Sequence, residues 1–123
     1  MTLNEYQQQA MTTCLPESDN FSYMMLNLAA EVGEIAGKVA KMIRKGQVRF
    51  EADGSMRMYS QGDDNEAWER EYDLRAEAGD VLWQLSGLCS VMGWELDDIA
   101  RQNLQKLADR QQRHVIDGSG DNR

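Results

Sequence analysis

The sequence contains few of the residues that build cross-linked proteins or metal–thiolate centres. Its 123 residues include two Cys, one Pro and one His. A disulfide framework or a zinc site needs more Cys and His than this, so we expect Cys14 and Cys89 to be ordinary thiols. A di-iron helical bundle needs a His three residues after a Glu on two helices, whereas this chain has only His114, near its end.

Positive charge is also scarce, with 13 Lys and Arg against 21 Asp and Glu, and the formal net charge is -8. A nucleic-acid polymer is therefore not an expected partner, because phosphate backbones are held by clustered cations; a nucleotide stays compatible if metal ions mask its charge. Long hydrophobic runs are absent too. The longest nearly uncharged run, residues 81–94, is too short to span a bilayer, and residues 1–5 do not begin a basic leader. We expect a cytoplasmic protein without membrane contact.

What the sequence does contain is helical periodicity. The length of the chain is typical of a single domain, and we expect one domain over residues 1–123. Thr2 and Glu5 form a capping-box pattern that predicts a first helix over about residues 2–14. A second helix follows the polar cluster 17–20, with apolar residues at helical spacing: Met25, Leu28, Ala29, Val32, Ile35, Ala36, Val39 and Ile43. A third is predicted to start near residues 63–66 and to end at about 92, before Gly93. The fourth is predicted over about 95–113, with Leu96, Ile99, Ala100, Leu104 and Leu107 facing inward.

The segment between the second and third helices has a different pattern. Alternating side chains on both sides of Asp53-Gly54 predict a β-hairpin with a two-residue turn, over about residues 47–62. Residues 114–123 read as a C-terminal tail. The sequence thus predicts an all-α fold, a four-helix bundle with a small β-hairpin insertion between its second and third helices.

One carboxylate spacing occurs twice, in Glu31-Val-Gly-Glu34 and in Glu77-Ala-Gly-Asp80. Residues three apart share a helix face, so each pair directs two carboxylates the same way. Two such pairs could cage a hard cation, which suits Mg²⁺, or Mn²⁺ as a substitute, and phosphate chemistry. The alternative for the first pair is an ordinary solvated stripe on an amphipathic helix.

The flanks of the second pair favour the metal interpretation. Asp80 leads into the uncharged run 81–94, and a buried carboxylate needs a partner or a metal. Gly33 and Gly79 are costly in helix interiors, so we expect them to mark a close approach of the two helices.

Side chains that could donate hydrogen bonds to phosphate follow on the fourth helix, where Asn103, Lys106 and Arg110 share one face. Lys38, one turn beyond Glu34, could serve similarly. Such donors beside a carboxylate cage could clamp phosphates, although a solvated polar face is the alternative for this helix taken alone.

These residues resemble the all-α nucleoside triphosphate pyrophosphohydrolases, specifically the MazG-like group. The segments that carry the resemblance are 28–34, which contains Glu-x-x-Glu, 77–85, which contains Glu-x-x-Asp, and 103–107. Each tetrad alone is weak, but the ordered set is fairly specific, and the resemblance extends from Tyr6 to about Arg110.

The resemblance implies that Glu31, Glu34, Glu77 and Asp80 hold Mg²⁺. A carboxylate near the metal would orient the attacking water, and we predict that Glu34 is this carboxylate. The resemblance also implies that Lys38, Asn103, Lys106 and Arg110 contact the triphosphate. The implied reaction converts a nucleoside triphosphate and water into a monophosphate and pyrophosphate, in a homodimer or homotetramer with sites near subunit boundaries.

The chain departs from the family pattern at three places. Ala30 stands where many members have another acid, which would reduce the number or the tightness of bound cations. The hairpin replaces a short helical connection, and the tail is an extension; either could reach the base pocket. Our leading hypothesis is a pyrophosphohydrolase for a (d)NTP, with a purine such as dGTP as one candidate. The alternatives are a pyrimidine-specific enzyme for dUTP or dCTP and a non-catalytic helical assembly module.

Overall fold

The structure is a computed structural model and describes residues 1–59 and 64–122. Its elements, in chain order, are α1 (Leu3–Met11), a short 3₁₀ helix (Pro16–Ser18), α2 (Phe21–Arg44), β1 (Val48–Phe50), β2 (Met56–Met58), α3 (Asp64–Val91) and α4 (Leu96–Gln112). The all-α fold with a hairpin between the second and third helices is therefore confirmed. Parts of three predicted segments, residues 60–62 of the hairpin, residue 63 at the start of the third helix and residue 123 of the tail, lie outside the described residues.

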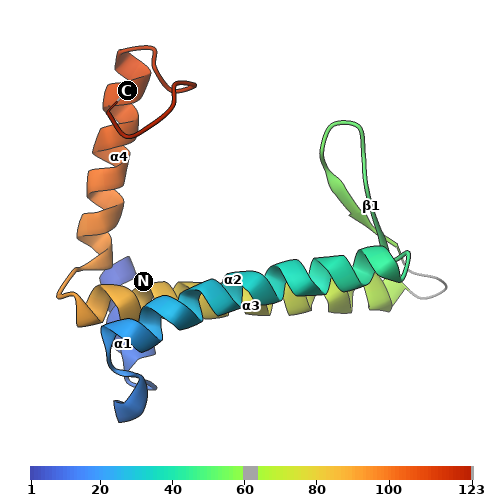
Figure 1. The fold of residues 1–123 in the computed structure, drawn as a ribbon, viewed down its shortest axis with the longest axis horizontal. Coiled ribbons are helices and arrows are strands. Elements are labelled where there is room, and N and C mark those ends of the chain that lie inside the picture. Colours follow the sequence, from blue (N-terminus) through green and yellow to red (C-terminus); the bar gives the residue numbers. More distant parts are fainter. Residues whose placement is uncertain (60–63, 123) are drawn as a thin grey trace.

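The long helices α2 and α3 lie side by side and antiparallel, and they form the body of the molecule (Figure 1). At one end of this pair, α1 packs across α3, and α4 leaves the body at a steep angle. At the other end the hairpin projects to the same side as α4, so the chain has the outline of a U (Figure 1). No helix in the described ranges is both long and apolar enough to cross a membrane.

Side chains of α1 fix the start of α4. The Gln7 amide nitrogen donates to the Ser90 hydroxyl at 3.0 Å, and the Gln7 side-chain oxygen accepts from the Leu96 backbone N–H at 2.9 Å. Asn4 Oδ1 accepts from the Asp97 N–H at 2.9 Å. Two of the N–H groups that a helix start leaves without intrahelical partners are thus satisfied by α1, which ties α4 to α1. The predicted capping box of Thr2 and Glu5 is present at the start of α1 itself.

The hairpin forms where the Asp-Gly signal predicts it. The strands pair antiparallel, with Val48 opposite Met58 and Phe50 opposite Met56. The turn is longer than the predicted two residues: the Gly54 N–H donates to the Glu51 carbonyl at 2.9 Å, and Gly54 has a φ of 82°. A glycine in this left-handed conformation is typical of a three-residue hairpin loop that contains a type I turn.

The glycine that allows a close contact between α2 and α3 is Gly87, and not one of the glycines that the sequence suggested. A Cβ at Gly87 would collide with the side chain of Met24, which is fully buried. The expectation for Gly33 and Gly79 is wrong, since a Cβ at either position would meet nothing within 4 Å. Both glycines lie on exposed sides of their helices.

The apolar stripe of α2 is only partly covered. Leu28, Ile35 and Val39 are half-buried, but an uncharged surface on the same helix stays exposed. We call this surface the exposed apolar face of α2; it consists of Met25, Leu26, Ala29, Val32, Ala36 and Ile43. The reason is that α3 packs against one side of α2 and nothing in the described chain covers the other.

The inward stripe predicted for α4 is also mostly wrong. Leu96 is buried, whereas Leu104 is 66% exposed and Leu107 is exposed as well. The physical reason is the direction of α4, which leaves the α2/α3 pair, so its later turns lie away from the other described helices (Figure 1).

Candidate functional site

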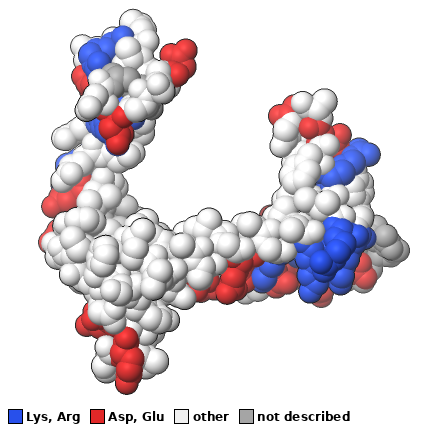
Figure 2. All heavy atoms as spheres, in the orientation of Figure 1, with Lys and Arg blue, Asp and Glu red and all other residues white. Residues whose placement is uncertain are grey.

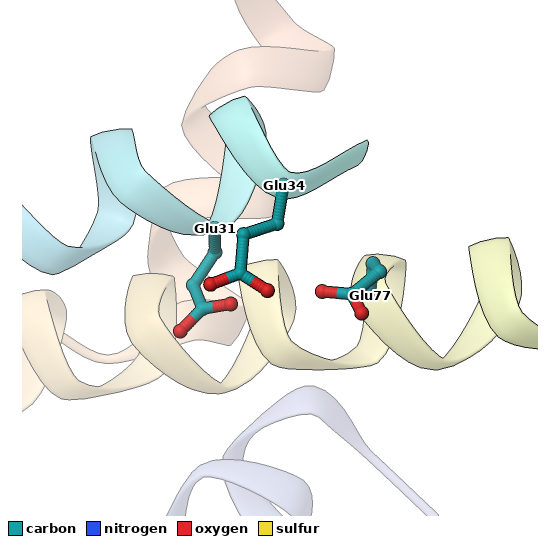
Figure 3. A group of neighbouring side chains, drawn as sticks. All are labelled: Glu31, Glu34 and Glu77. Carbon is teal, nitrogen blue, oxygen red and sulfur yellow. The ribbon is translucent and has the colours of Figure 1, made fainter. Parts of the chain in front are cut away.

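Three of the four predicted carboxylates meet at the contact between α2 and α3. Glu31 and Glu34 extend from α2 toward α3, and Glu77 lies on α3 beside them (Figure 3). One oxygen from each side chain lies within 4.8 Å of the others. We call this group the acidic trio. The three-residue spacing on α2 places Glu31 and Glu34 on one face, and the antiparallel packing brings Glu77 to that face.

The trio concentrates negative charge around one buried side chain, since Glu77 is buried, Glu31 is half-buried and Glu34 is exposed. The Glu77 side chain is only 10% exposed, and its Oε2 atom has no hydrogen-bond partner among the described residues. The charge of Glu77, and then that of Glu31, raises the pKa of Glu34. Like charges held this close oppose ionisation unless a cation joins them.

Two neighbours partly compensate this charge. Lys38 Nζ lies 2.6 Å from Glu77 Oε1, and this hydrogen bond raises the pKa of Lys38. The amide nitrogen of Asn27 donates to Glu31 Oε1 at 2.9 Å. One ammonium against three carboxylates leaves the group with an excess of negative charge and with a buried acceptor, Glu77 Oε2, still free.

The donor set fits a hard divalent cation. All three side chains offer carboxylate oxygens, which are the ligands that Mg²⁺ and Mn²⁺ prefer, and no His or Cys belongs to the group. The buried and unpartnered Glu77 Oε2 is the observation that distinguishes this cluster from exposed surface acids. Glu31, Glu34 and Glu77 are thus the residues that could hold the ion.

Asp80, the fourth predicted ligand, lies one turn further along α3 and is exposed. Its carboxylate is not one of the three that approach within 4.8 Å. The expectation that the uncharged run 81–94 buries Asp80 is wrong; Glu77 is the buried acid of this pair.

The α4 side chains that were predicted to donate hydrogen bonds to phosphate do not reach the trio within one chain. Asn103 and Lys106 are exposed on a helix that projects away from the α2/α3 pair (Figure 1). Arg110 is buried, and its Nη2 atom lies 3.1 Å from Asp121 Oδ1 in the tail. Lys106 Nζ lies 3.6 Å from the same oxygen. Asp121, in the tail, is therefore already paired with two of the three donors predicted on α4.

Lys38, which the sequence predicted as a phosphate contact, lies beside the trio together with three cations that the sequence interpretation missed. We call this group the basic pocket: a cavity of about 270 Å³ lined by Lys38, Lys41, Lys45 and Arg70, together with Met42 and Asp73. On the face shown in Figure 2, acidic atoms lie along the helix pair and basic atoms gather next to them, near the base of the hairpin. The spacing of Lys38, Lys41 and Lys45, which places them on successive turns of one face, was the available signal.

The fold and the site define an all-α protein with a carboxylate cluster suited to a divalent cation. The family model of the MazG nucleotide pyrophosphohydrolase domain matches residues 19–115, and the chain belongs to this family. The match covers α2, the hairpin, α3 and α4, so it includes the acidic trio. Membership supports nucleotide pyrophosphohydrolase activity in general and a nucleotide substrate, and enzymes of this family use divalent metals.

Comparison with individual proteins adds one relative. Gene 37 protein of Mycobacterium phage L5 is 37% identical over 105 residues, which are 85% of this chain and 78% of the phage protein. Its name carries no information about activity. No solved structure matches the chain significantly.

Proposed function

We propose that this protein hydrolyses a nucleoside or deoxynucleoside triphosphate to the monophosphate and pyrophosphate, with Mg²⁺ held by Glu31, Glu34 and Glu77. Asp80 is the proposed fourth ligand, because it lies one helical turn from Glu77. The observation that carries the proposal is the acidic trio itself, with the buried and unpartnered oxygen of Glu77. Mg²⁺ at these carboxylates would neutralise phosphate charge and lower the pKa of a bound water.

The chain's own residues would position the reactants. Glu34 is the proposed base: it orients a water toward the α-phosphorus and accepts its proton. The water oxygen forms a bond to the α-phosphorus, and the bond between that phosphorus and the bridging oxygen breaks. The electron pair stays on the departing pyrophosphate. Lys38 already lies at the trio, where its ammonium can contact a phosphate oxygen.

The exposed apolar face of α2 supports a homodimer or homotetramer. Leu26 is 75% exposed on this face, and Met25 and Val32 are also exposed. An apolar helix face of this length is typical of a surface that another subunit covers. A second copy also offers a way for Asn103, Lys106 and Arg110 to reach a trio, since α4 points away from the trio of its own chain.

The test is a panel of all common NTPs and dNTPs, incubated with purified protein and Mg²⁺, with both products identified. We expect monophosphate and pyrophosphate from at least one substrate. The nucleobase of the substrate that is hydrolysed fastest distinguishes a purine-specific enzyme from one specific for dUTP or dCTP. Absence of both products from every substrate would favour the non-catalytic assembly module and overturn the proposal.

A matched pair of variants connects that activity to the trio. Glu34→Gln removes the proposed base and should abolish product formation at every pH tested. Glu71→Gln changes an exposed acid on α3 that is outside the trio and should retain activity. Equal activity of the two variants would contradict the role of Glu34.

A further inference from the structure

The basic pocket is an unusual feature in a chain with a net charge of -8. Four cations line it, and Asp73 is the one acid among the lining residues. Lys38 and Lys41 lie on α2, Lys45 is the C-cap of that helix, and the fourth cation, Arg70, comes from α3. Such a local excess of positive charge attracts anions even when the whole molecule is acidic.

Most of the donors in this pocket are unused. Lys41 and Lys45 have no acid within ion-pair distance in the described part of the chain. The Arg70 side chain is only 15% exposed, and its Nε atom is buried without a hydrogen-bond partner among described residues. This Nε atom is out of reach of solvent, so the ammonium groups of the exposed Lys41 and Lys45 are the donors that an anion entering the pocket meets first.

The other contacts of Arg70 hold its guanidinium in place. Its Nη2 atom donates to the Tyr59 carbonyl, and its Nη1 atom lies 3.6 Å from Glu66. An arginine fixed in this way presents its planar donors without losing much further side-chain entropy, which is the arrangement that phosphate recognition favours.

The position of the pocket relative to the trio identifies the anion. Lys38 belongs to both, since it lines the pocket and lies 2.6 Å from Glu77. A substrate with its α-phosphate at the trio therefore has the pocket within reach of its remaining phosphates. The volume of about 270 Å³ is small for a whole nucleotide but ample for two phosphate groups.

We propose that the basic pocket binds the β- and γ-phosphates of the substrate and retains them as pyrophosphate after the cleavage. This inference rests on the proposed function, which places the α-phosphate at the trio. Lys41, Lys45 and Arg70 then distinguish a triphosphate from a monophosphate, because only the triphosphate reaches them.

The direct test is calorimetric titration of sodium pyrophosphate into the full chain in buffer that contains a chelator. Without metal the trio cannot contribute attraction, so binding reports the cations of the pocket. We compare the wild type with the double variant Lys41→Gln and Lys45→Gln. Both side chains are exposed, so the fold is not at risk. The control is Arg44→Gln, which removes an exposed charge from the same helix outside the pocket.

We expect the double variant to weaken pyrophosphate binding by roughly ten-fold or more, and the control to leave it unchanged. Binding of a monophosphate should not change in either protein. In the steady state, the double variant should raise KM for the triphosphate more than it lowers kcat, because these contacts are made before the transition state as well as in it.

The possible outcomes separate this inference from the proposed function. If the wild type hydrolyses triphosphates but binds pyrophosphate no better than the double variant does, the inference is wrong and the proposed function stands. If the wild type binds pyrophosphate through Lys41 and Lys45 but hydrolyses nothing, the pyrophosphate site is supported and the proposed function is wrong.

Discussion

The contact between α2 and α3 has two adjoining regions of opposite charge. The acidic trio crowds three carboxylates around one lysine, and the basic pocket, one to two turns further along α2, gathers four cations around one aspartate. Charges that serve stability are usually interleaved so that each finds a partner. Among the described residues, the two regions are joined by the ion pair between Lys38 and Glu77 at their boundary.

This separation indicates a ligand that is itself divided by charge. A divalent cation would compensate the trio, and the terminal phosphates would compensate the pocket. The cations of α4 provide a contrast, because Lys106 and Arg110 already have a partner in Asp121. Unpartnered charge is therefore a better guide to the site than charge alone.

Removing the buried member of the trio should have the largest effect. Glu77→Gln keeps the size of the side chain but removes the charge that a cation needs. We expect kcat/KM to fall by at least about 100-fold, because the bound cation contributes several kcal/mol to the stabilisation of the transition state. Mn²⁺ titration should show the loss of binding directly. Asp80→Asn should weaken Mn²⁺ binding less, since Asp80 is exposed and outside the trio.

A variant that separates the proposed subunits should affect hydrolysis at the acidic trio but not pyrophosphate binding in the basic pocket. Leu26→Glu places a charge on the exposed apolar face of α2, and we expect light scattering to show a smaller assembly than in the wild type. Hydrolysis should fall with it, because the donors of α4 would come from a second copy. Pyrophosphate binding should persist, because the basic pocket is complete within one chain. An unchanged mass for Leu26→Glu, with Leu15→Glu as the control for an exposed leucine elsewhere, would contradict the role of this face.

A pair of glycine variants should show where the stability of the α2–α3 contact arises. Gly87→Ala forces Met24 to move within a fully buried site, and we expect it to lower the free energy of unfolding by about 1–3 kcal/mol. Gly79→Ala adds a methyl group in open space in mid-helix and should raise that free energy by about 0.5–1 kcal/mol. Urea unfolding measures both. A destabilising Gly79→Ala would show that the helices approach closely near the trio as well.

The smallest effect concerns the paired cations of α4. The hydrogen bond from Arg110, together with the nearby Lys106, lowers the pKa of Asp121. The contact is therefore fully present above the ordinary pKa of an aspartate and is lost as the pH falls through the lowered value. The protection of the amides of residues 115–122 against hydrogen exchange, relative to the intrinsic rate at each pH, should decrease in that acidic range. Asp121→Asn should show the fast exchange already at neutral pH, and slow exchange in this variant would contradict the contact.

Local signals were sufficient to predict the elements of the fold. The capping box at Thr2 and Glu5, the helical periodicity and the hairpin at Asp53-Gly54 are each determined by nearby residues. All of them are present, although the hairpin turn is one residue longer than predicted. The meeting of Glu31, Glu34 and Glu77 was also predictable, because helical spacing sets the face of each pair and two antiparallel helices bring the faces together.

The relative placement of the helices could not be predicted in the same way. The direction of α4 depends on contacts of Asn4 and Gln7 with residues about 90 positions later, which leave no local pattern. An apolar stripe indicates that a helix face is suited to being covered but not by what. The inward face predicted for α4 is therefore one that this chain leaves mostly exposed. The contribution of Arg70 to the basic pocket could not be predicted either, because it depends on the register of α3 against α2.

The central claim is that the trio acts on the α-phosphorus while the basic pocket holds the departing diphosphate. Hydrolysis of the preferred substrate in ¹⁸O-labelled water, followed by mass spectrometry of both products, tests it most directly. The account predicts that the label enters the monophosphate and that the pyrophosphate stays unlabelled. Label in the pyrophosphate would mean that water attacks the β-phosphorus, and it would contradict this assignment of the two regions.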